Sequence, residues 1–376
     1  MKKYPLAKPI ITKSGIQEVL SVLKSGCLSI GPKLQDFENK FKKKIGTKYA
    51  CAVSSGTAGL HLAMIVAGIK DGDEVITSPF SFIASANSIL YVGGKPVFVD
   101  IDPITFNIDP NKIEEKITEK TKAILVVHIF GQSADMDPII KIAKKYKLKI
   151  IEDACESLLA TYKGKNVGTF GESAVFAFYP NKQMTTGEGG MIVTDDKKIY
   201  EACLSLRNQG RSANMQWLDH EVLGYNYRMD EMSAALGISQ MAVLESFIEK
   251  RRKIAELYSK HLQESALIVG LPETAIHNTH SWFVYVVQIK NLKIKRDDII
   301  RLLAERGIAS KPYLPSIHLF SFYKKLTGHK KGDFPISEMT SDKSLALPFY
   351  PGLEEKDVKY ICNNLIEVIN EYEKRI

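Results

Sequence analysis

Residues 50–67 read ACAVSSGTAGLHLAMIVA: an apolar run of strand length, a turn of small residues and an apolar helical pattern. Six further apolar runs of strand length follow, and helical patterns alternate with them. This alternation is typical of an α/β fold with a mostly parallel sheet covered by helices on both faces. Several runs are apolar throughout, as strands buried on both faces must be. The predicted strands are Ala50–Val53, Glu74–Thr77, Pro96–Val99, Ala123–Ile129, Lys149–Ile151, Ala174–Phe178 and Gly190–Thr194.

The helical patterns divide the chain into two parts. In the first part they lie at 57–67, 84–91, 139–146 and 229–240, and the last continues into a charged helix near 248–263. From about His280 the period changes to a strand-like run at 282–289, a helix at 296–306 and a final helix at 355–372. We therefore predict a large domain at 1–245 and a smaller α+β domain at 246–376, with residues 1–14 packing on either one.

Composition limits the class of protein. The five cysteines are far apart and form no CxxC pair, which excludes a disulfide framework or a zinc cluster, and we expect no metal. The N-terminus lacks the apolar core of a signal peptide, and no stretch approaches the ~18 apolar residues of a membrane span. We expect a cytoplasmic protein. Its net charge of +8 leaves an anionic small ligand, a nucleic acid or mere solubility open.

The turn in the opening stretch precedes a helix at Gly56 and Thr57. A helix N-terminus behind such a turn presents free N–H groups and a partial positive charge, which suit a phosphate. Every α/β protein has turns of this kind, so an ordinary connection is the alternative. The stretch lacks GxxxxGK[ST] and GxGxxG, which argues against a nucleoside triphosphate or a dinucleotide.

A second candidate is the strand end at 149–157, KIIEDACES, where two adjacent carboxylates follow an apolar run. Residues at the carboxyl ends of parallel strands face the ligand crevice. Because alternate residues point to opposite faces, only one of Glu152 and Asp153 is expected to face a ligand. The alternative is an aspartate that caps the next helix.

A third candidate is Lys182, which lies between an aromatic strand and the glycine-rich run 185–190, TTGEGG. A lysine in a crowded pocket can form a Schiff base, although a solvated lysine is the alternative. A phosphate cradle, a strand-end acid and an amine are the parts that a pyridoxal 5′-phosphate (PLP) site needs. The three candidates together therefore point to PLP chemistry.

With these motifs the chain resembles the DegT/StrS family of nucleotide-sugar aminotransferases, which are fold type I PLP enzymes. The resemblance covers nearly the whole chain and implies a homodimer with shared active sites. It also implies two substrates, a nucleotide-linked keto sugar and an amino-acid donor, with glutamate as the expected donor. The motifs that carry it are Ser25–Pro32, Ser55–Thr57, Pro79–Ser85, Ile151–Ala154, Lys182 with Thr185–Gly190, and Gly224–Met229.

The resemblance also implies roles for single residues. Lys182 and Asp153 are the expected catalytic residues, through a Schiff base and a contact to the pyridine nitrogen. The cofactor contacts it implies are Gly56 and Thr57 on the phosphate, Phe82 on the ring face, Glu156 near the ring hydroxyl, and Asn226 from the partner subunit. The substrate contacts it implies are Ser29, Arg228, Tyr313 and His318, of which His318 has an ordinary loop histidine as its alternative.

Three positions depart from the family pattern. Ala177 stands where a phosphate-binding serine is common, so that contact is missing or replaced. Glu156 stands where glutamine is common, and a carboxylate beside a phenolate oxygen requires a shared proton. Leu159 occupies a position where glycine is usual, which narrows the turn after the strand.

The resemblance predicts a ping-pong transamination, and three other readings compete with it. A sugar dehydratase of the same family typically has histidine in place of the Schiff-base lysine, so Lys182 favours the transaminase. A nucleic-acid-binding regulator would use the basic surface, but we find no helix-turn-helix and no basic-aromatic patch. The last alternative is an idle scaffold that holds the cofactor without turnover.

Overall fold

The large domain is built on one seven-stranded sheet. The computed structural model of the protein describes residues 2–212, 219–265, 268–291 and 293–374. The strand order in the sheet is β1 (Tyr49–Val53), β9 (Gly190–Thr194), β8 (Ser173–Ala177), β5 (Lys149–Asp153), β4 (Thr121–Val127), β2 (Glu74–Thr77) and β3 (Lys95–Phe98). Only β9 runs antiparallel to its neighbours. The predicted mostly parallel, seven-stranded sheet is confirmed.

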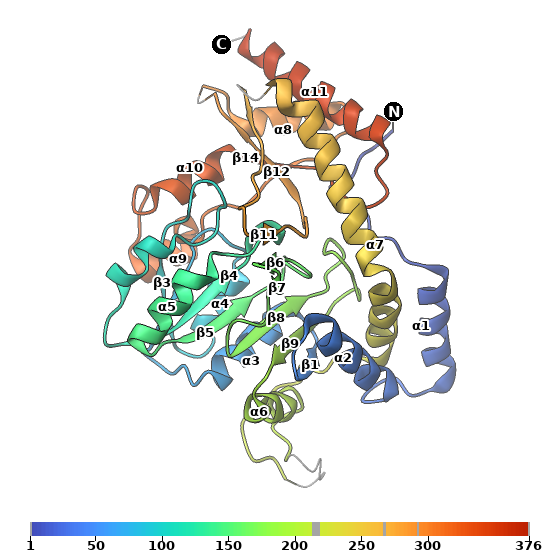
Figure 1. The fold of residues 1–376 in the computed structure, drawn as a ribbon, viewed down its shortest axis with the longest axis vertical. Coiled ribbons are helices and arrows are strands. Elements are labelled where there is room, and N and C mark those ends of the chain that lie inside the picture. The colour runs from blue at the N-terminus through green and yellow to red at the C-terminus, as the bar shows by residue number, and fades with distance from the viewer. Residues whose placement is uncertain (1, 213–218, 266–267, 292, 375–376) are drawn as a thin grey trace.

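Helices cover both faces of this sheet (Figure 1). One face packs against α3 (Gly56–Val66), α4 (Ala84–Leu90) and α6 (Lys197–Arg207), through buried residues such as Val175 and Ile192. The other face packs against α2 (Pro32–Ile45), α5 (Met136–Tyr146) and the first half of α7 (Glu231–Leu262). Since both faces are buried, the strands are apolar throughout rather than alternating.

The second domain is a four-stranded antiparallel sheet with helices around it. Its strands are β10 (Val269–Gly270), β12 (Tyr285–Ile289), β14 (Ser344–Leu347) and β13 (Lys311–Pro312). The helices are α8 (Arg296–Glu305), α11 (Glu355–Glu373) and the second half of α7, which share one core with the sheet. Two shorter helices, α9 (Ser321–Thr327) and α10 (Pro335–Lys343), follow β13.

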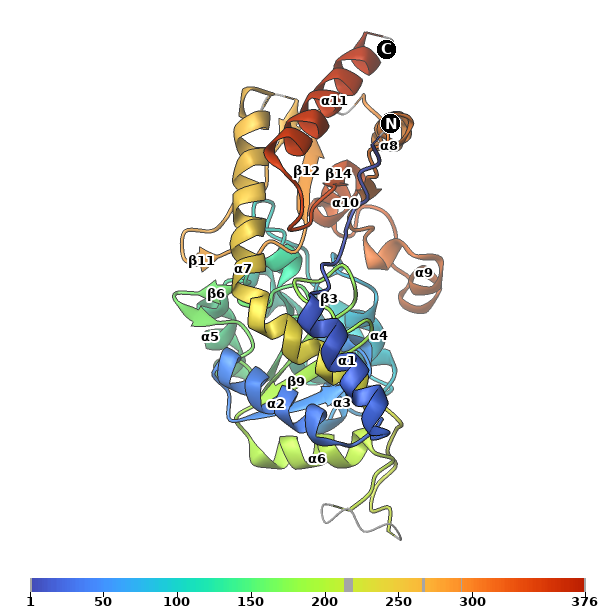
Figure 2. The same cartoon turned by 90° about the vertical axis from the view of Figure 1, so that its right-hand side faces the viewer.

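The helix α7 connects the two domains as one continuous element (Figures 1 and 2). Residue 245, the predicted domain boundary, lies inside this helix, and the boundary stays a prediction. The N-terminal residues contact both domains. Tyr4 pairs with Ile308 and is buried in the core of the small domain, whereas α1 (Lys13–Ser25) packs along α7.

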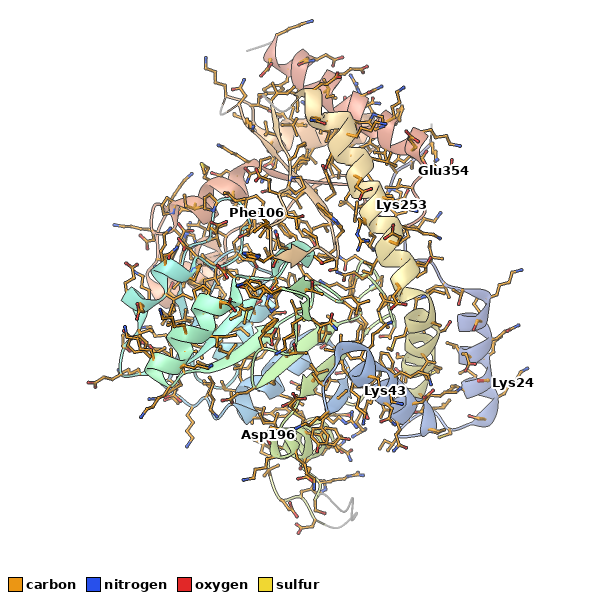
Figure 3. All side chains as sticks on the ribbon, viewed as in Figure 1. Lys24, Lys43, Phe106, Asp196, Lys253 and Glu354 are labelled. Carbon is orange, nitrogen blue, oxygen red and sulfur yellow. The ribbon has the colours of Figure 1, made fainter. Side chains whose placement is uncertain are left out.

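The sequence patterns missed two features that join the domains. A short sheet combines β6 (Thr161–Tyr162) and β7 (Lys165–Asn166) with β11 (Asn278–Thr279), a segment more than 100 residues later in the chain. An aromatic cluster also lies at the border of the two domains, where Phe106 and Phe130 pack near Val286 (Figure 3). In the part of the chain that the structure describes, no helix is long and apolar enough to span a membrane.

Candidate active site

The end of β5 places its two carboxylates on opposite faces of the sheet, as alternation predicts. Glu152 is fully buried and accepts four hydrogen bonds. The donors are Nε2 of His128 at 3.0 Å and the backbone amides of Gly168, Phe170 and Gly171 at 2.7–2.8 Å. Burial raises the pKa of Glu152, but these donors outweigh burial and hold the pKa below its ordinary value.

Asp153 faces the other side and has fewer partners. Its Oδ2 accepts from the hydroxyl of Ser85 at 2.6 Å, and its Oδ1 accepts from the amide of Cys155 at 3.2 Å. Ser85 is in turn 2.7 Å from the hydroxyl of Ser81. An ionised carboxylate offers about four acceptor sites, so Asp153, which is 5% exposed, keeps capacity for a further donor.

The amine of Lys182 lies between a carboxylate and an aromatic ring. Its Nζ is 3.6 Å from Oε1 of Glu156 and 4.0 Å from the ring centroid of Phe283. Its side chain is 13% exposed, so the solvated alternative does not hold. The other carboxylate oxygen of Glu156 accepts from the amide of Phe130 at 3.0 Å, which fixes the carboxylate facing Lys182.

The N-terminus of α3 lies directly against this group. Ser55 caps the helix by accepting from the amide of Ala58 at 3.0 Å, and the first-turn amides of Gly56 and Thr57 have no partner within the helix. A Cβ at Gly56 would lie 2.7 Å from Cβ of Ala177 and 3.0 Å from Sγ of Cys155. Only glycine therefore lets the backbone come this close.

Cys155 contacts both Asp153 and the first turn of α3. Its amide contacts Asp153, and its sulfur lies beside Gly56. Burial and the negative charge of Asp153 raise the pKa of the Cys155 thiol, while the charge of Lys182 opposes them. Asp153 and the first turn of α3 therefore meet at Cys155, and Lys182 lies against Glu156, the next residue in the chain. Their chemistry fits PLP, which needs an anion site, a partner for the ring nitrogen and an amine.

The positions that depart from the family pattern are explained by their surroundings. Ala177 packs on Gly56, at the N-terminus of α3. Leu159 has φ of 61°, in the left-handed region where glycine is usual, and it packs against the core beside α2. Burial raises the pKa of Glu156, and the charge of Lys182 opposes this.

Of two more predicted residues, Tyr313 lies beside the group and Phe82 lies at the surface. Tyr313 packs on Phe130 and Phe283, and burial together with the charge of Glu156 raises the pKa of Tyr313 well above its usual range. Phe82 follows β2 with 60% of its surface exposed, which is unusual for a phenylalanine. Phe82 is therefore not a core residue, and its role on the ring face stays a prediction.

The contacts of the remaining predicted residues, as far as the structure describes them, are with other parts of the chain than Lys182. Ser29 is exposed and pairs with Asp230, and Asn226 is exposed and pairs with Asn208. Arg228 donates to Asn208 and lines a surface cavity of about 400 Å³ between α2 and α6. His318 is fully buried and lies 3.0 Å from Glu338. The roles of these four residues stay predictions.

Sequence reasoning missed three residues that support the group. Ser85, the donor to Asp153, lies in the motif Pro79–Ser85, where two serines four residues apart were the available signal. Phe283 lies under the Lys182 amine, and Arg251 donates to the backbone carbonyl of Lys182 at 3.3 Å. The helical period places Arg251 on the buried face of α7, with Phe247 and Tyr258. Its burial could therefore have been predicted from the sequence.

The comparisons with known proteins agree with this geometry. GDP-perosamine synthase of Escherichia coli O157:H7 is 39% identical over 98% of this chain and 99% of its own. Spore coat polysaccharide biosynthesis protein SpsC of Bacillus subtilis is 39% identical over 97% of both chains. Spr1654 of Streptococcus pneumoniae, which is described as a putative sugar aminotransferase, was solved in two forms. One is the PLP form, and the other is the form with pyridoxamine 5′-phosphate (PMP). Each has a TM-score of 0.93 and 28% identity and covers 98% of this chain and 99% of its own.

The predicted cofactor and fold type are confirmed by these relatives and neighbours, because the matched structures include PLP and PMP forms of the same fold. The predicted enzyme class, a PLP-dependent sugar aminotransferase, is confirmed as well. The family model covers residues 9–366 of 376. The chain therefore belongs to the DegT/DnrJ/EryC1/StrS aminotransferase family.

Proposed function

We propose that the protein transfers an amino group from an amino acid, glutamate as the family resemblance implies, to the keto group of a nucleotide-linked hexose. The observation that carries the proposal is the convergence of Asp153, Lys182 and the first turn of α3 around the adjacent residues Cys155 and Glu156. Relatives named GDP-perosamine synthase from three organisms make GDP the first nucleotide to test. The process we propose is polysaccharide or glycan biosynthesis, in line with the name of the Bacillus relative.

The residues would divide the work as follows. PLP, when bound, supplies an electron-poor ring that stabilises negative charge on the adjacent substrate carbon. The amides of Gly56 and Thr57 bind its phosphate, and Phe82 covers one ring face. Asp153 holds the proton on the ring nitrogen. Lys182 would hold the cofactor through its amine, and the freed amine would carry the proton that the reaction moves.

We also propose a homodimer in which Asn226 and Arg228 complete the site of the partner subunit. In this structure Asn226 pairs with Asn208, and Arg228 lines a surface cavity between α2 and α6. An unpartnered apolar stripe supports a second copy: Ile16, Leu20 and Leu23 of α1 are each about half exposed. Ser29 and Tyr313 are the proposed contacts to the sugar nucleotide.

The assignment of Lys182 and of the substrate class can be tested with the PMP form. Keto sugars linked to GDP, UDP and dTDP would be mixed with it in single-turnover experiments that follow the cofactor absorbance. We expect one nucleotide class to restore the PLP spectrum rapidly. The proposal fails if glutamate converts the PLP form but no keto sugar converts the PMP form. Lys182→Ala should abolish both half-reactions.

The shared site can be tested by mixing two inactive variants. Lys182→Ala and Asn226→Ala alter residues that would come from different subunits of one site. A mixed dimer then holds one site with both changes and one intact site, so mixing should restore activity. Absence of restored activity in a mixture shown to contain mixed dimers contradicts the shared site.

We propose a cytoplasmic location, because all five cysteines are unpaired in the structure, as is usual in a reducing compartment. Fractionation of the native host with a cytoplasmic marker enzyme would test it.

A further inference from the structure

Arg251, on α7, is a buried cation. It is 3% exposed, and burial alone lowers the pKa of its guanidinium, to about 10. Within the described residues no carboxylate lies at ion-pair distance from it, whereas the neighbouring Arg252 is partly exposed and pairs with Glu249. A charge buried in this way is unfavourable unless its donors are well used. Lys253 marks this level of α7 in Figure 3.

The guanidinium of Arg251 is bound to three backbone carbonyls. Its Nη2 donates to the carbonyl of Lys182 at 3.3 Å, and its Nη1 donates to those of Trp282 at 3.3 Å and Phe283 at 3.1 Å. The ring of Phe283 is the one that lies 4.0 Å from Nζ of Lys182. One planar group therefore holds both the backbone of the lysine and the ring beneath its amine.

The same segment is held from its other side. Phe283 donates its amide to the carbonyl of Phe130 at 3.0 Å, and the amide of Phe130 binds Glu156. Glu156 is the carboxylate that faces the amine of Lys182. The amine thus lies between a carboxylate and a ring that belong to one connected network, and Arg251 joins that network to the backbone of Lys182.

We propose that Arg251 is a positioning residue, which fixes Lys182 and Phe283 so that the lysine amine meets the aldehyde carbon of PLP. The inference rests on the proposed role of Lys182. In the bond-forming step the amine nitrogen bonds to that carbon, and the aldehyde oxygen leaves as water with two protons, without any oxidant or reductant. Displacement by about 1 Å can slow such a reaction by about 100-fold.

The test compares a ligand that bonds to Lys182 with one that does not. Apoprotein of the wild type, Arg251→Met and Arg251→Lys would be mixed with PLP, and the covalent link followed by absorbance and by borohydride reduction. Binding of PMP, which has no aldehyde, would be measured in parallel. We expect Arg251→Met to slow capture of PLP by about 10-fold or more while PMP affinity stays unchanged, with Arg251→Lys between it and the wild type.

The matched control is Arg252→Met, which changes the exposed neighbour on the same helix and should leave both ligands unaffected. Equal weakening of PLP capture and PMP binding would show a merely structural role and overturn the inference. If Arg251→Met does not fold, Arg251→Lys decides, and a wild-type rate in that variant overturns the inference.

The same experiment distinguishes failure of the proposed role of Lys182 from failure of the proposed role of Arg251. If Lys182→Ala still forms a reducible link, the role of Lys182 is refuted. If Lys182→Ala loses the link and folded Arg251→Met forms it at the wild-type rate, only the role of Arg251 falls.

Discussion

Asp153 and Glu152 are adjacent buried carboxylates at the end of β5, yet the two faces of the sheet surround them differently. Glu152 has four donors, from His128 and three backbone amides, and its acceptor sites are filled. Asp153 has two donors, Ser85 and the amide of Cys155, and keeps room for another. Burial alone therefore does not separate a structural carboxylate from a functional one, but unfilled acceptor capacity does.

The same contrast separates two pairs of basic and acidic residues. Glu338 accepts from Nε2 of His318 and from the amides of Gly332 and Phe334, so the carboxylate of this closed pair is filled, while Nδ1 of His318 has no partner among the described residues. Lys182 lies 3.6 Å from Glu156, longer than a good hydrogen bond, and against an aromatic ring. The open pair lies beside Asp153 and Cys155, which is where the chemistry is proposed.

The largest change in activity is expected at Asp153. Asp153→Asn removes the charge that would keep the ring nitrogen protonated, so kcat for the glutamate half-reaction should fall by about 1,000-fold. Because the carboxylate has few protein donors, the free energy of unfolding of the apoprotein should change little. Stopped-flow absorbance and urea unfolding measure the two quantities. Loss of stability with kcat preserved would reverse the assignment of the two faces.

Glu152→Gln should show the opposite profile. An amide cannot accept from His128 and three backbone amides equally well, so the free energy of unfolding should fall by about 3 kcal/mol, while kcat changes little. The pKa of Glu152 in the folded protein lies below its ordinary value of 4.5. The advantage of the wild type is therefore present above pH 4.5 and lost as the pH falls below it. Urea unfolding of both apoproteins across this range would check the sign.

The fold was largely readable from the sequence because strands buried on both faces leave continuous apolar runs. All seven strands of the large sheet appear within two residues of the prediction, and β4 ends two residues early, at Val127 instead of Ile129. Phe130 has φ of 59° there, so the chain turns where apolarity alone predicts extension. The small sheet of β6, β7 and β11 was unreadable, since two-residue strands carry no period.

The candidate site could be predicted from the sequence where a residue type is rare in the structural element that carries it. Lys182 and Asp153 were found in this way. Alternation predicted that only one of the two carboxylates faces a ligand, but the choice between them depends on Gly168–Gly171, which are distant in sequence. No sequence pattern predicts that Arg251 donates to backbone carbonyls.

His318 tests whether the closed pair is structural. His318→Ala removes one donor to Glu338 and leaves a small cavity, so the free energy of unfolding should fall by about 2 kcal/mol, with KM for the sugar nucleotide unchanged. The matched variant Glu338→Gln should destabilise similarly. A raised KM in His318→Ala with normal stability would restore the substrate contact that the family resemblance implies.

The smallest change in the free energy of unfolding is expected at Glu156. Its pH dependence has the opposite sign to that expected at Glu152. Burial raises the folded pKa of Glu156 above its ordinary 4.5, and Lys182 opposes this. Wild-type stability relative to Glu156→Gln should therefore be highest below pH 4.5 and fall by about 1 kcal/mol as the pH rises through the folded pKa. Urea unfolding of the apoproteins measures this difference. In a Lys182→Met background the opposing charge is gone, so the fall should be steeper; a shallower fall would mean that Lys182 does not act on Glu156.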